Sequence, residues 1–368
     1  MFVVPAQDIA GMLEAGQLKV DHPLDADQIQ PASLDLRLGR TCYRMAASAI
    51  PGPARGIEDL ASGPLLIDAM TLSDEGTRLE AGSTYIVECL EHLDLPPRMS
   101  AVVNPKSSSG RIDLFVRSLT DRASHFDRMP RGFKGRIYLE ITPISFPVIV
   151  RPGSRLAQIR FLDAESVVWR DVMPLLADET ITDLGAMREG DTVWLSAQIT
   201  DSRVEPCGWR ARRNCAKAID VDKKSGCLPL DYFEPVYGER GSGGPSIFLH
   251  PNDFFILASQ EKVRIPELFA AEMIAFDAGI GEVRVHYAGF FDPGFGDDNG
   301  RPTAQGVLEV RGRDVPMVLE NGQMIAGLKF HPMASAPRTL YGAGAGSNYQ
   351  GQGLRLSKHF QPEISRAA

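Results

Sequence analysis

A short hydroxyl-rich turn carries the residues best suited to bind a polyphosphate. The sequence NPKSSSGR, residues 104–111, places three consecutive serines between Lys106 and Arg111, with Gly110 beside the arginine. Hydroxyls, backbone N–H groups and two cations in one tight turn are the donors that phosphate oxygens need. Serine-rich turns are also common without any ligand, so the motif alone is a weak indication of a phosphate site.

Two glutamates lie in similar apolar surroundings and could transfer protons. Glu140 lies in YLEI and Glu309 in VLEV, and neither segment alternates cleanly between apolar and polar residues, which indicates partial burial. Burial raises the pKa of a carboxylate toward neutral pH, where it can take and return protons. Each should have a hydrogen-bonding neighbour, and Ser107 and Arg111 are the candidates. The alternative is a strand glutamate that faces solvent.

The two glutamates correspond because the chain repeats itself. Residues 138–161 align without gaps with residues 307–330 at a constant offset of 169, and residues 79–96 align with 249–266 at an offset of 170. Solenoid repeats run to roughly 20–50 residues, so an offset this long indicates two copies of one domain. A chain of 368 residues can hold two such domains, each with its own core.

The predicted elements are mostly strands. After a predicted helix that begins near Pro5, short apolar segments alternate with Gly, Pro and Asp, as in all-β domains. We predict a first domain over residues 1–165, a second over residues 245–368 and a connecting segment, 166–244, that belongs partly to the second domain. Residues from 162 to about 244 match neither repeat core. The basic run of that segment is diluted by nearby acids and is more typical of a solvated face than of a ligand site.

The copies differ in the chemical groups that they keep. Where the first copy has its serine loop, the second reads FDAGIG, residues 276–281, without cations or hydroxyls. The second copy has Asp292 in a hairpin turn where the first has Pro130. An Asp in a turn often only caps its own backbone. The complementary losses instead favour a composite site, in which the loop 106–111 of a first copy faces Asp292 and Glu309 of a second copy.

Composition limits the functions further. The net charge of −8 argues against a protein that coats nucleic acid. Five cysteines without a C-x-x-C pair disfavour a disulfide framework and a zinc ribbon. The N-terminus has no basic leader, and no apolar run approaches the ~18 residues of a membrane span. We expect a cytoplasmic protein with reduced thiols and with neither nucleic acid nor a membrane as partner.

Four motifs from both halves of the chain form a specific set. They are QIQPASLDLRLG (28–39), KSSSGR (106–111), FFDPGFG with GVLEV (290–296 and 306–310) and SNYQGQG (347–353). Together they resemble the zinc-independent dCTP deaminases of the trimeric dUTPase-like superfamily, and the long, tandem-duplicated form fits best. The resemblance implies a mainly β protein, with two tandem dUTPase-like β-barrel (β-clip) domains and a few short helices.

The resemblance also implies roles for individual residues. The family's phosphate-binding and catalytic loop matches Lys106, Ser107, Ser108 and Arg111. Its deoxyribose-binding acid matches Asp292, and its catalytic glutamate matches Glu309 or, equally, Glu140. The residues that close over the triphosphate match Tyr341, Asn348 and Gln352 in their spacing.

Three departures from the family pattern stand out. Asn348 occupies a position where a lysine is usual, residues 297–303 lengthen the second hairpin, and Pro130 replaces the sugar-binding acid of the first copy. The last departure makes a complete site within the first copy doubtful.

The implied reaction is hydrolysis of dCTP to dUTP and ammonia, which supplies dUTP for dTMP synthesis. Water must attack C4, and one partly buried glutamate can serve the proton transfers. The zinc route needs an H-x-E and a P-C-x-x-C signature, and the sequence contains neither. We therefore expect no zinc and no metal held by the protein, with Mg²⁺ bound through the triphosphate. Sites between subunits of a trimer in the family imply a homo-oligomer with a trimer-based arrangement of domains.

Two other functions remain open at this point. A dUTP diphosphatase, or a bifunctional dCTP deaminase and dUTP diphosphatase, would use the same fold, with Asp292 positioning water for attack on phosphorus. A non-catalytic nucleotide-binding regulatory protein would bind nucleotide tightly without turnover.

Overall fold

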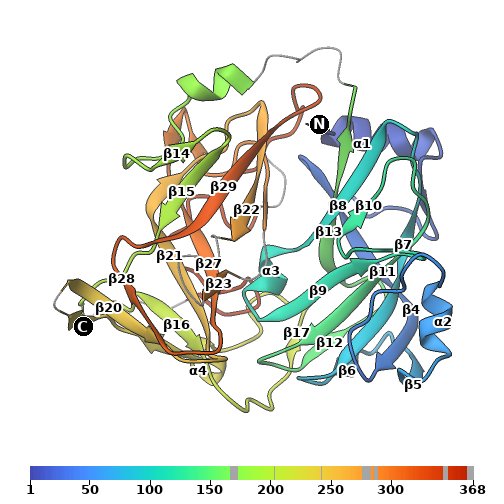
Figure 1. Cartoon of the computed structure of the whole chain (residues 1–368), viewed down its shortest axis with the longest axis horizontal. Coiled ribbons are helices and arrows are strands. Elements are labelled where there is room, and N and C mark those ends of the chain that lie inside the picture. Colours follow the sequence, from blue (N-terminus) through green and yellow to red (C-terminus); the bar gives the residue numbers. More distant parts are fainter. Residues whose placement is uncertain are drawn as a thin grey trace.

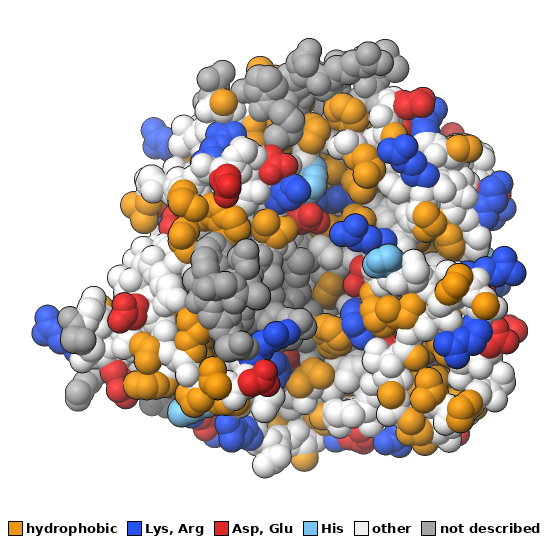
Figure 2. Space-filling view, in the orientation of Figure 1, with side chains coloured by type: hydrophobic (Ala, Val, Ile, Leu, Met, Phe, Trp, Pro, Cys, Tyr) orange, Lys and Arg blue, Asp and Glu red, His pale blue; other side chains and the backbone are white. Residues whose placement is uncertain are grey.

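The chain is mainly β, as predicted, and its strands form two groups that lie side by side (Figure 1). The computed structural model describes residues 1–165, 173–202, 204–241, 243–275, 283–285, 289–342 and 347–362. The loop 276–281 of the second copy lies outside these residues. On the face in Figure 2, basic and acidic side chains are interspersed with hydrophobic ones. None of the described helices is long and apolar enough to span a membrane.

The first group is built on one large sheet. Its main path is β10 (Arg128–Met129), β8 (Met99–Pro105), β13 (Arg155–Asp163), β4 (Ser33–Met45), β7 (Thr84–Asp94), β11 (Lys134–Pro143) and β9 (Leu114–Leu119). Four strands join it at the side, namely β1 (Phe2–Val3), β2 (Leu18–Val20), β3 (Ile29–Gln30) and β5 (Leu66–Thr71). A small sheet contains β17 (Ile219–Asp220), β12 (Val148–Val150) and β6 (Thr77–Leu79).

The second group has two five-stranded sheets. One contains β14 (Arg188–Glu189), β15 (Thr192–Ser196), β29 (Met324–Pro332), β22 (Phe269–Ala275) and β24 (Phe290–Phe291). The other contains β18 (Phe233–Val236), β16 (Gly208–Ala211), β21 (Phe254–Val263), β27 (Ala304–Gly312) and β23 (Val283–Val285). Smaller sheets are formed by β19 (Glu239–Gly241), β20 (Gly244–Leu249) and β28 (Met317–Glu320), and by β25 (Asp297–Asp298) and β26 (Arg301–Pro302).

The helices are few and short. The predicted N-terminal helix is α1 (Ala6–Glu14), which begins directly after Pro5 and buries Ile9 and Met12. The others are α2 (Ile57–Ala61), α3 (Ser107–Gly110), α4 (Pro229–Tyr232) and a 3₁₀ turn (Met173–Asp178). In Figure 1, α3 lies where the two groups of strands meet.

The two groups pair their strands in the same register. Glu140 of β11 lies opposite Ile86 of β7, and Glu309 of β27 lies opposite Ile256 of β21. These partners are related by the offsets of 169 and 170 residues that the sequence shows. Tandem duplication remains an interpretation, and these registers support it.

The connecting segment is more structured than expected. Strand β15 pairs with β29 and β16 pairs with β21, just as the two ends of β4 pair with β13 and β7. Part of the connecting segment therefore belongs to the sheets of the second group, although its sequence matches neither repeat core. The first copy uses one continuous strand, whereas the second is interrupted between residues 196 and 208, so no repeated pattern is visible in the sequence.

An aromatic cluster with rings from both groups anchors the C-terminal tail, residues 347–362. Phe360 makes edge-to-face contacts with Tyr232 and Phe233, with centroids 5.4 Å apart in each pair, and Phe146 contacts the same two rings. Phe360 is 4% exposed and belongs to a core cluster that contains residues of both groups. Such aromatic pairs prefer this geometry, and each adds stability beyond burial alone.

We predict that Phe360→Ala will loosen the tail. A buried Phe→Ala change costs about 3–5 kcal/mol, and here the loss falls on a terminal segment that can detach without unfolding the sheets. Limited proteolysis should cleave the tail of the variant faster than that of the wild type. The control is Phe248→Ala, since Phe248 is 54% exposed. Equal cleavage of the tail in Phe360→Ala and wild type would contradict the prediction.

Candidate active site

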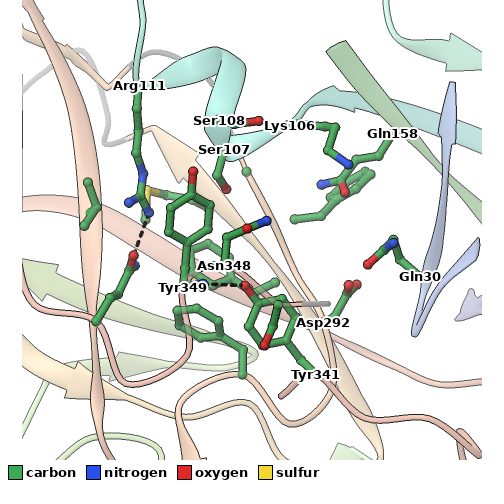
Figure 3. A pocket seen from close by; sticks show the side chains of 18 of the residues that line it. Gln30, Lys106, Ser107, Ser108, Arg111, Gln158, Asp292, Tyr341, Asn348 and Tyr349 are labelled. Atoms are coloured by element: carbon green, nitrogen blue, oxygen red, sulfur yellow. Dashed lines mark hydrogen bonds between the residues drawn. The ribbon is translucent and has the colours of Figure 1, made fainter. Parts of the chain in front are cut away.

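A pocket at the junction of the two groups of strands collects most of the predicted site residues. It has a volume of about 870 Å³, part of which is open to solvent. The predicted residues that line it are Lys106, Ser107, Ser108, Arg111, Asp292, Glu309, Tyr341, Asn348 and Gln352. In Figure 3, residues from the loop at α3 (Lys106, Ser107, Ser108 and Arg111) converge with Asp292 and Tyr341 of the second half and with Asn348 of the tail. The composite arrangement is therefore present within one chain.

The serine loop owes its position to strand β13. Strand β8 ends at Pro105, and the Lys106 N–H donates to the Leu156 carbonyl before α3 begins. The Ser109 hydroxyl donates to the same carbonyl at 2.8 Å, so this serine fixes the turn. Ser107 and Ser108 line the pocket.

Lys106 is paired with a buried acid. Its ammonium group forms an ion pair with the carboxylate of Asp35, a residue of β4. Asp35 is 1% exposed, and Oδ1 has no hydrogen-bond partner among the described residues. The ion pair holds the Lys106 side chain next to the serine loop that begins with this residue. Asp35 lies inside the matching motif at 28–39, but no role was predicted for it from the sequence.

Arg111 connects the loop, the tail and the glutamate. It is 3% exposed and donates to the Gln352 side chain at 2.9 Å and to the Arg355 carbonyl at 3.1 Å. Its guanidinium carbon lies 4.0 Å from the centre of the Tyr349 ring. Its Nε atom has no hydrogen-bond partner among the described residues and lies 4.0 Å from Glu309 Oε1.

Glu309 is a buried carboxyl with a weak counterion. It is 4% exposed, and desolvation raises its pKa to about 8, although the charge of Arg111 opposes this rise. Of the two partners predicted from the sequence, Arg111 is the one that the structure pairs with it, at ion-pair distance. A carboxyl that titrates near neutral pH can both accept and donate a proton under working conditions.

Glu140 is also buried, but it does not reach the pocket. It is 1% exposed and accepts hydrogen bonds from Arg117 at 2.6 Å and from Ser48 at 3.0 Å. The expectation that Ser107 and Arg111 are its neighbours is wrong. In the register of β9 and β11, Arg117 lies directly opposite Glu140, so its positive charge balances the carboxylate within the first half.

Asp292 follows β24 in a tight turn. Gly294 has φ of +89°, and a Cβ there would lie 3.1 Å from the backbone nitrogen of Tyr341, so glycine lets the tail pass close to the turn. Asp292 is 8% exposed, and desolvation raises its pKa. Its Oδ1 lies 3.5 Å from Arg160 in the first half. The sequence did not single out Arg160, nor Gln30 and Gln158, which also line the pocket.

The tail is fastened over the pocket by polar contacts. Gln352 also donates to the Gln305 carbonyl at 3.0 Å, and the Ser357 hydroxyl donates to the Ser108 carbonyl at 2.8 Å. The Tyr341 hydroxyl accepts from the Tyr349 N–H at 3.2 Å, and burial raises the pKa of Tyr341 to about 12, so its phenol is neutral. Asn348, at the departure from the family pattern, lines the pocket.

Within the described residues, no group of three His, Cys, Asp or Glu side chains could hold a metal ion. The expectation of a mechanism without zinc stays a prediction.

Family models match both halves of the chain. The model for "2'-deoxycytidine 5'-triphosphate deaminase (DCD), C-terminal domain" matches residues 163–360, and the corresponding N-terminal domain model matches residues 1–165. A crystal structure of 2'-deoxycytidine 5'-triphosphate deaminase from Agrobacterium tumefaciens is 43% identical, with a TM-score of 0.83 over 92% of this chain and 99% of the other.

Shorter relatives match less than half of this chain. The dCTP deaminase of Ignicoccus hospitalis is 29% identical over 163 residues, which are 44% of this chain and 84% of the relative. An enzyme of Persephonella marina named "dCTP deaminase, dUMP-forming" is 32% identical over 160 residues, or 43% and 81%. The β architecture and the match to the solved structure define a dUTPase-like enzyme fold. The chain belongs to the dCTP deaminase family.

The buried carboxyl predicts a particular pH dependence of stability. The pKa of Glu309 is raised from 4.5 to about 8 by folding, so the folded state binds more protons between these values and loses stability as pH rises through them. We predict that Glu309→Gln removes this loss. Relative to wild type, the variant should gain a few kcal/mol between pH 4.5 and 8, because each pKa unit corresponds to about 1.4 kcal/mol.

Urea denaturation at a series of pH values measures this difference. Glu140→Gln is the matched control, since it leaves Arg117 without its counterion and should lower stability at neutral pH. A difference between Glu309→Gln and wild type that does not change from pH 4.5 to 8 would show that Glu309 is not buried as a protonated acid.

Proposed function

We propose that this protein hydrolyses dCTP to dUTP and ammonia without zinc, with Glu309 as the group that transfers protons. The observation that carries the proposal is the position of Glu309: a buried carboxyl with a pKa of about 8, beside Arg111, in a pocket that also holds the serine loop and the tail. Membership of the dCTP deaminase family supports the same reaction.

The pocket offers a partner for each part of the substrate. The triphosphate, with its Mg²⁺, would lie against Lys106, Ser107 and Ser108, where cations and hydroxyls meet. The sugar would lie at Asp292, whose carboxylate can accept a hydrogen bond from a hydroxyl. The base would lie at Glu309, with the tail residues closing over the nucleotide. We propose no protein-held metal.

The proton transfers follow from the titration of Glu309. As its carboxylate, it takes a proton from the water molecule whose oxygen bonds to C4, and it returns a proton to the ring nitrogen N3. The C4–N bond then breaks, and the amino group leaves as ammonia with a proton from the added hydroxyl. A pKa near the working pH lets one group serve both directions without a large energetic penalty. Arg111 would balance the charge that changes on Glu309.

Deamination alone is the reaction that we propose. Some relatives are named dUMP-forming, which would also require attack of water on phosphorus. Asp292, the acid considered for that step, already has a partner, because its Oδ1 lies 3.5 Å from the guanidinium of Arg160. A homo-oligomer and a location in the cytoplasm remain predictions from the sequence.

The decisive experiment is product analysis. The purified protein is treated with a chelator, supplied with Mg²⁺ alone and incubated with dCTP while ammonia is assayed and nucleotides are separated. Ammonia with dUTP is the expected result. Ammonia with dUMP and pyrophosphate would establish the bifunctional reaction, and bound but unchanged dCTP would overturn the proposal in favour of a regulatory protein.

The two buried glutamates should differ in their effect on turnover. We predict that Glu309→Gln and Arg111→Ala lower kcat by at least about 100-fold, the lower range for loss of a proton-transfer group. Glu140→Gln should keep kcat within a few-fold of wild type in the fraction that circular dichroism shows to be folded. An active Glu309→Gln together with an inactive Glu140→Gln would place the reaction in the first copy instead.

A further inference from the structure

A deeply buried arginine of the first half points into the second. Arg160 lies in the middle of β13 and is 1% exposed. Its Nη1 donates to the Ala271 carbonyl at 3.1 Å, and its Nη2 donates to the Phe291 carbonyl at 3.3 Å. Its guanidinium carbon lies 4.0 Å from the centre of the Phe290 ring. All of these partners belong to the second half.

The same guanidinium faces the acid of the candidate site. Arg160 Nη2 lies 3.5 Å from Asp292 Oδ1, and both side chains are buried. Asp292 lines the pocket, whereas Arg160 does not. Arg160 therefore lies behind Asp292, and any effect on a ligand must pass through that acid and the segment that carries it.

We propose that Arg160 is a positioning residue for substrate binding: it holds the Asp292 carboxylate ionised and oriented so that this acid accepts a hydrogen bond from a hydroxyl of the nucleotide sugar. This inference rests on the proposed function, because it takes the nucleotide as the ligand of the pocket. A buried carboxylate without a cation would take up a proton or turn away, and in either case the acceptor would be weakened. The two hydrogen bonds to the Ala271 and Phe291 carbonyls also tie the guanidinium to the backbone of β22 and β24.

Other charged groups near Asp292 do not replace Arg160. Lys106 lowers the pKa of Asp292 and Asp35 raises it, and these two residues are ion-paired with each other, so their effects oppose one another. Tyr341 is neutral at working pH. Arg160 is the cation that most strongly counters the desolvation of Asp292.

A second acid lies near Arg160 but has its own partner. Burial lowers the pKa of Arg160, whereas the negative charge of Glu272 counters this by electrostatic attraction, and the Glu272 carboxylate lies 3.3 Å from the imidazole of His331. Burial raises the pKa of Glu272, but the hydrogen bond with His331 and the charges of His331, Arg160 and Lys329 together outweigh this effect and lower it. Glu272 therefore stays ionised and supports the charged form of Arg160.

The second copy provides a matched control. At the offset of 169 residues, Arg160 corresponds to Lys329 of β29. The Lys329 side chain is 40% exposed and lies 4.0 Å from Asp191 at the surface. Lys329→Met therefore removes a cation from the equivalent strand position without touching the pocket.

The test compares Arg160→Met, Arg160→Lys and Lys329→Met, each in full-length protein whose folding is checked by thermal denaturation. Arg160→Met should raise KM for dCTP by roughly 30-fold or more, the lower range for truncation of one partner of a buried charge pair, with a smaller change in kcat. Arg160→Lys keeps the charge but not the fork of donors, so it should raise KM less. Lys329→Met should leave KM unchanged.

The pH profile gives a readout that a purely structural role would not move. Asp292 must be ionised to accept the hydrogen bond, and loss of Arg160 raises its pKa further. The acid limb of kcat/KM should therefore move to higher pH in Arg160→Met and move less in Arg160→Lys. If Arg160→Met does not fold, the acid limb of kcat/KM and the KM of Arg160→Lys test the proposal instead. A wild-type profile and KM in a folded Arg160 variant would overturn the proposal.

A double-mutant cycle shows whether Arg160 acts through Asp292. In the Asp292→Asn background the carboxylate is gone, so adding Arg160→Met should change KM by no more than about two-fold. If the KM of the double variant instead rises by the product of the two single-variant factors, the two residues act independently and the inference is overturned. The same cycle can be measured as the Kd of dCTP in the Glu309→Gln background. This measurement separates failure of the inference from failure of the proposed reaction, since it needs no turnover.

Discussion

Buried charges that find their partners across the junction of the two halves are the constraint on which the site depends. Arg111 of the first half meets Glu309 of the second, Arg160 meets Asp292, and Arg311 of the second half pairs with Asp113 of the first. An ionised group without a partner is costly in a low-dielectric interior. Separation of the halves would leave these charges unpaired or exposed, so the contacts that shape the pocket also hold the two halves together.

The two corresponding glutamates show how similar surroundings can give different chemistry. Glu140 lies opposite Arg117 on the neighbouring strand, accepts a short hydrogen bond from it and is neutralised within its own half. Glu309 faces a guanidinium at 4.0 Å, and its pKa rises to about 8. The first arrangement stabilises a folded domain. The second leaves a carboxyl poorly compensated, which lowers stability at neutral pH and suits proton transfer.

Sequence reasoning succeeded where the information is local or repeated. The short apolar segments predicted the β fold, and the motifs that resemble the dCTP deaminases predicted most of the pocket, because each motif keeps its residues in one turn or strand. It missed Arg160, which looks like an ordinary charged residue of a strand. Its burial is created by the second half, 111 residues away in the chain at Ala271, and no local periodicity reports such packing. It missed β15 and β16 because an interruption hides their likeness to β4.

The tail links closure of the pocket to the arrangement of the proposed catalytic pair. Gln352 and the Arg355 carbonyl hold two nitrogens of Arg111, and Tyr349 covers its face, so the guanidinium can lie beside Glu309 only when the tail is in place. Ser357 fixes the same segment to the first half, and Phe360 packs against Phe233 of the second. A tail that detaches would remove the neighbours that orient Arg111 and admit water to Glu309. Its pKa would then fall toward that of a solvated carboxyl, so the packing of a terminal aromatic ring bears directly on the proton chemistry of a residue in another strand.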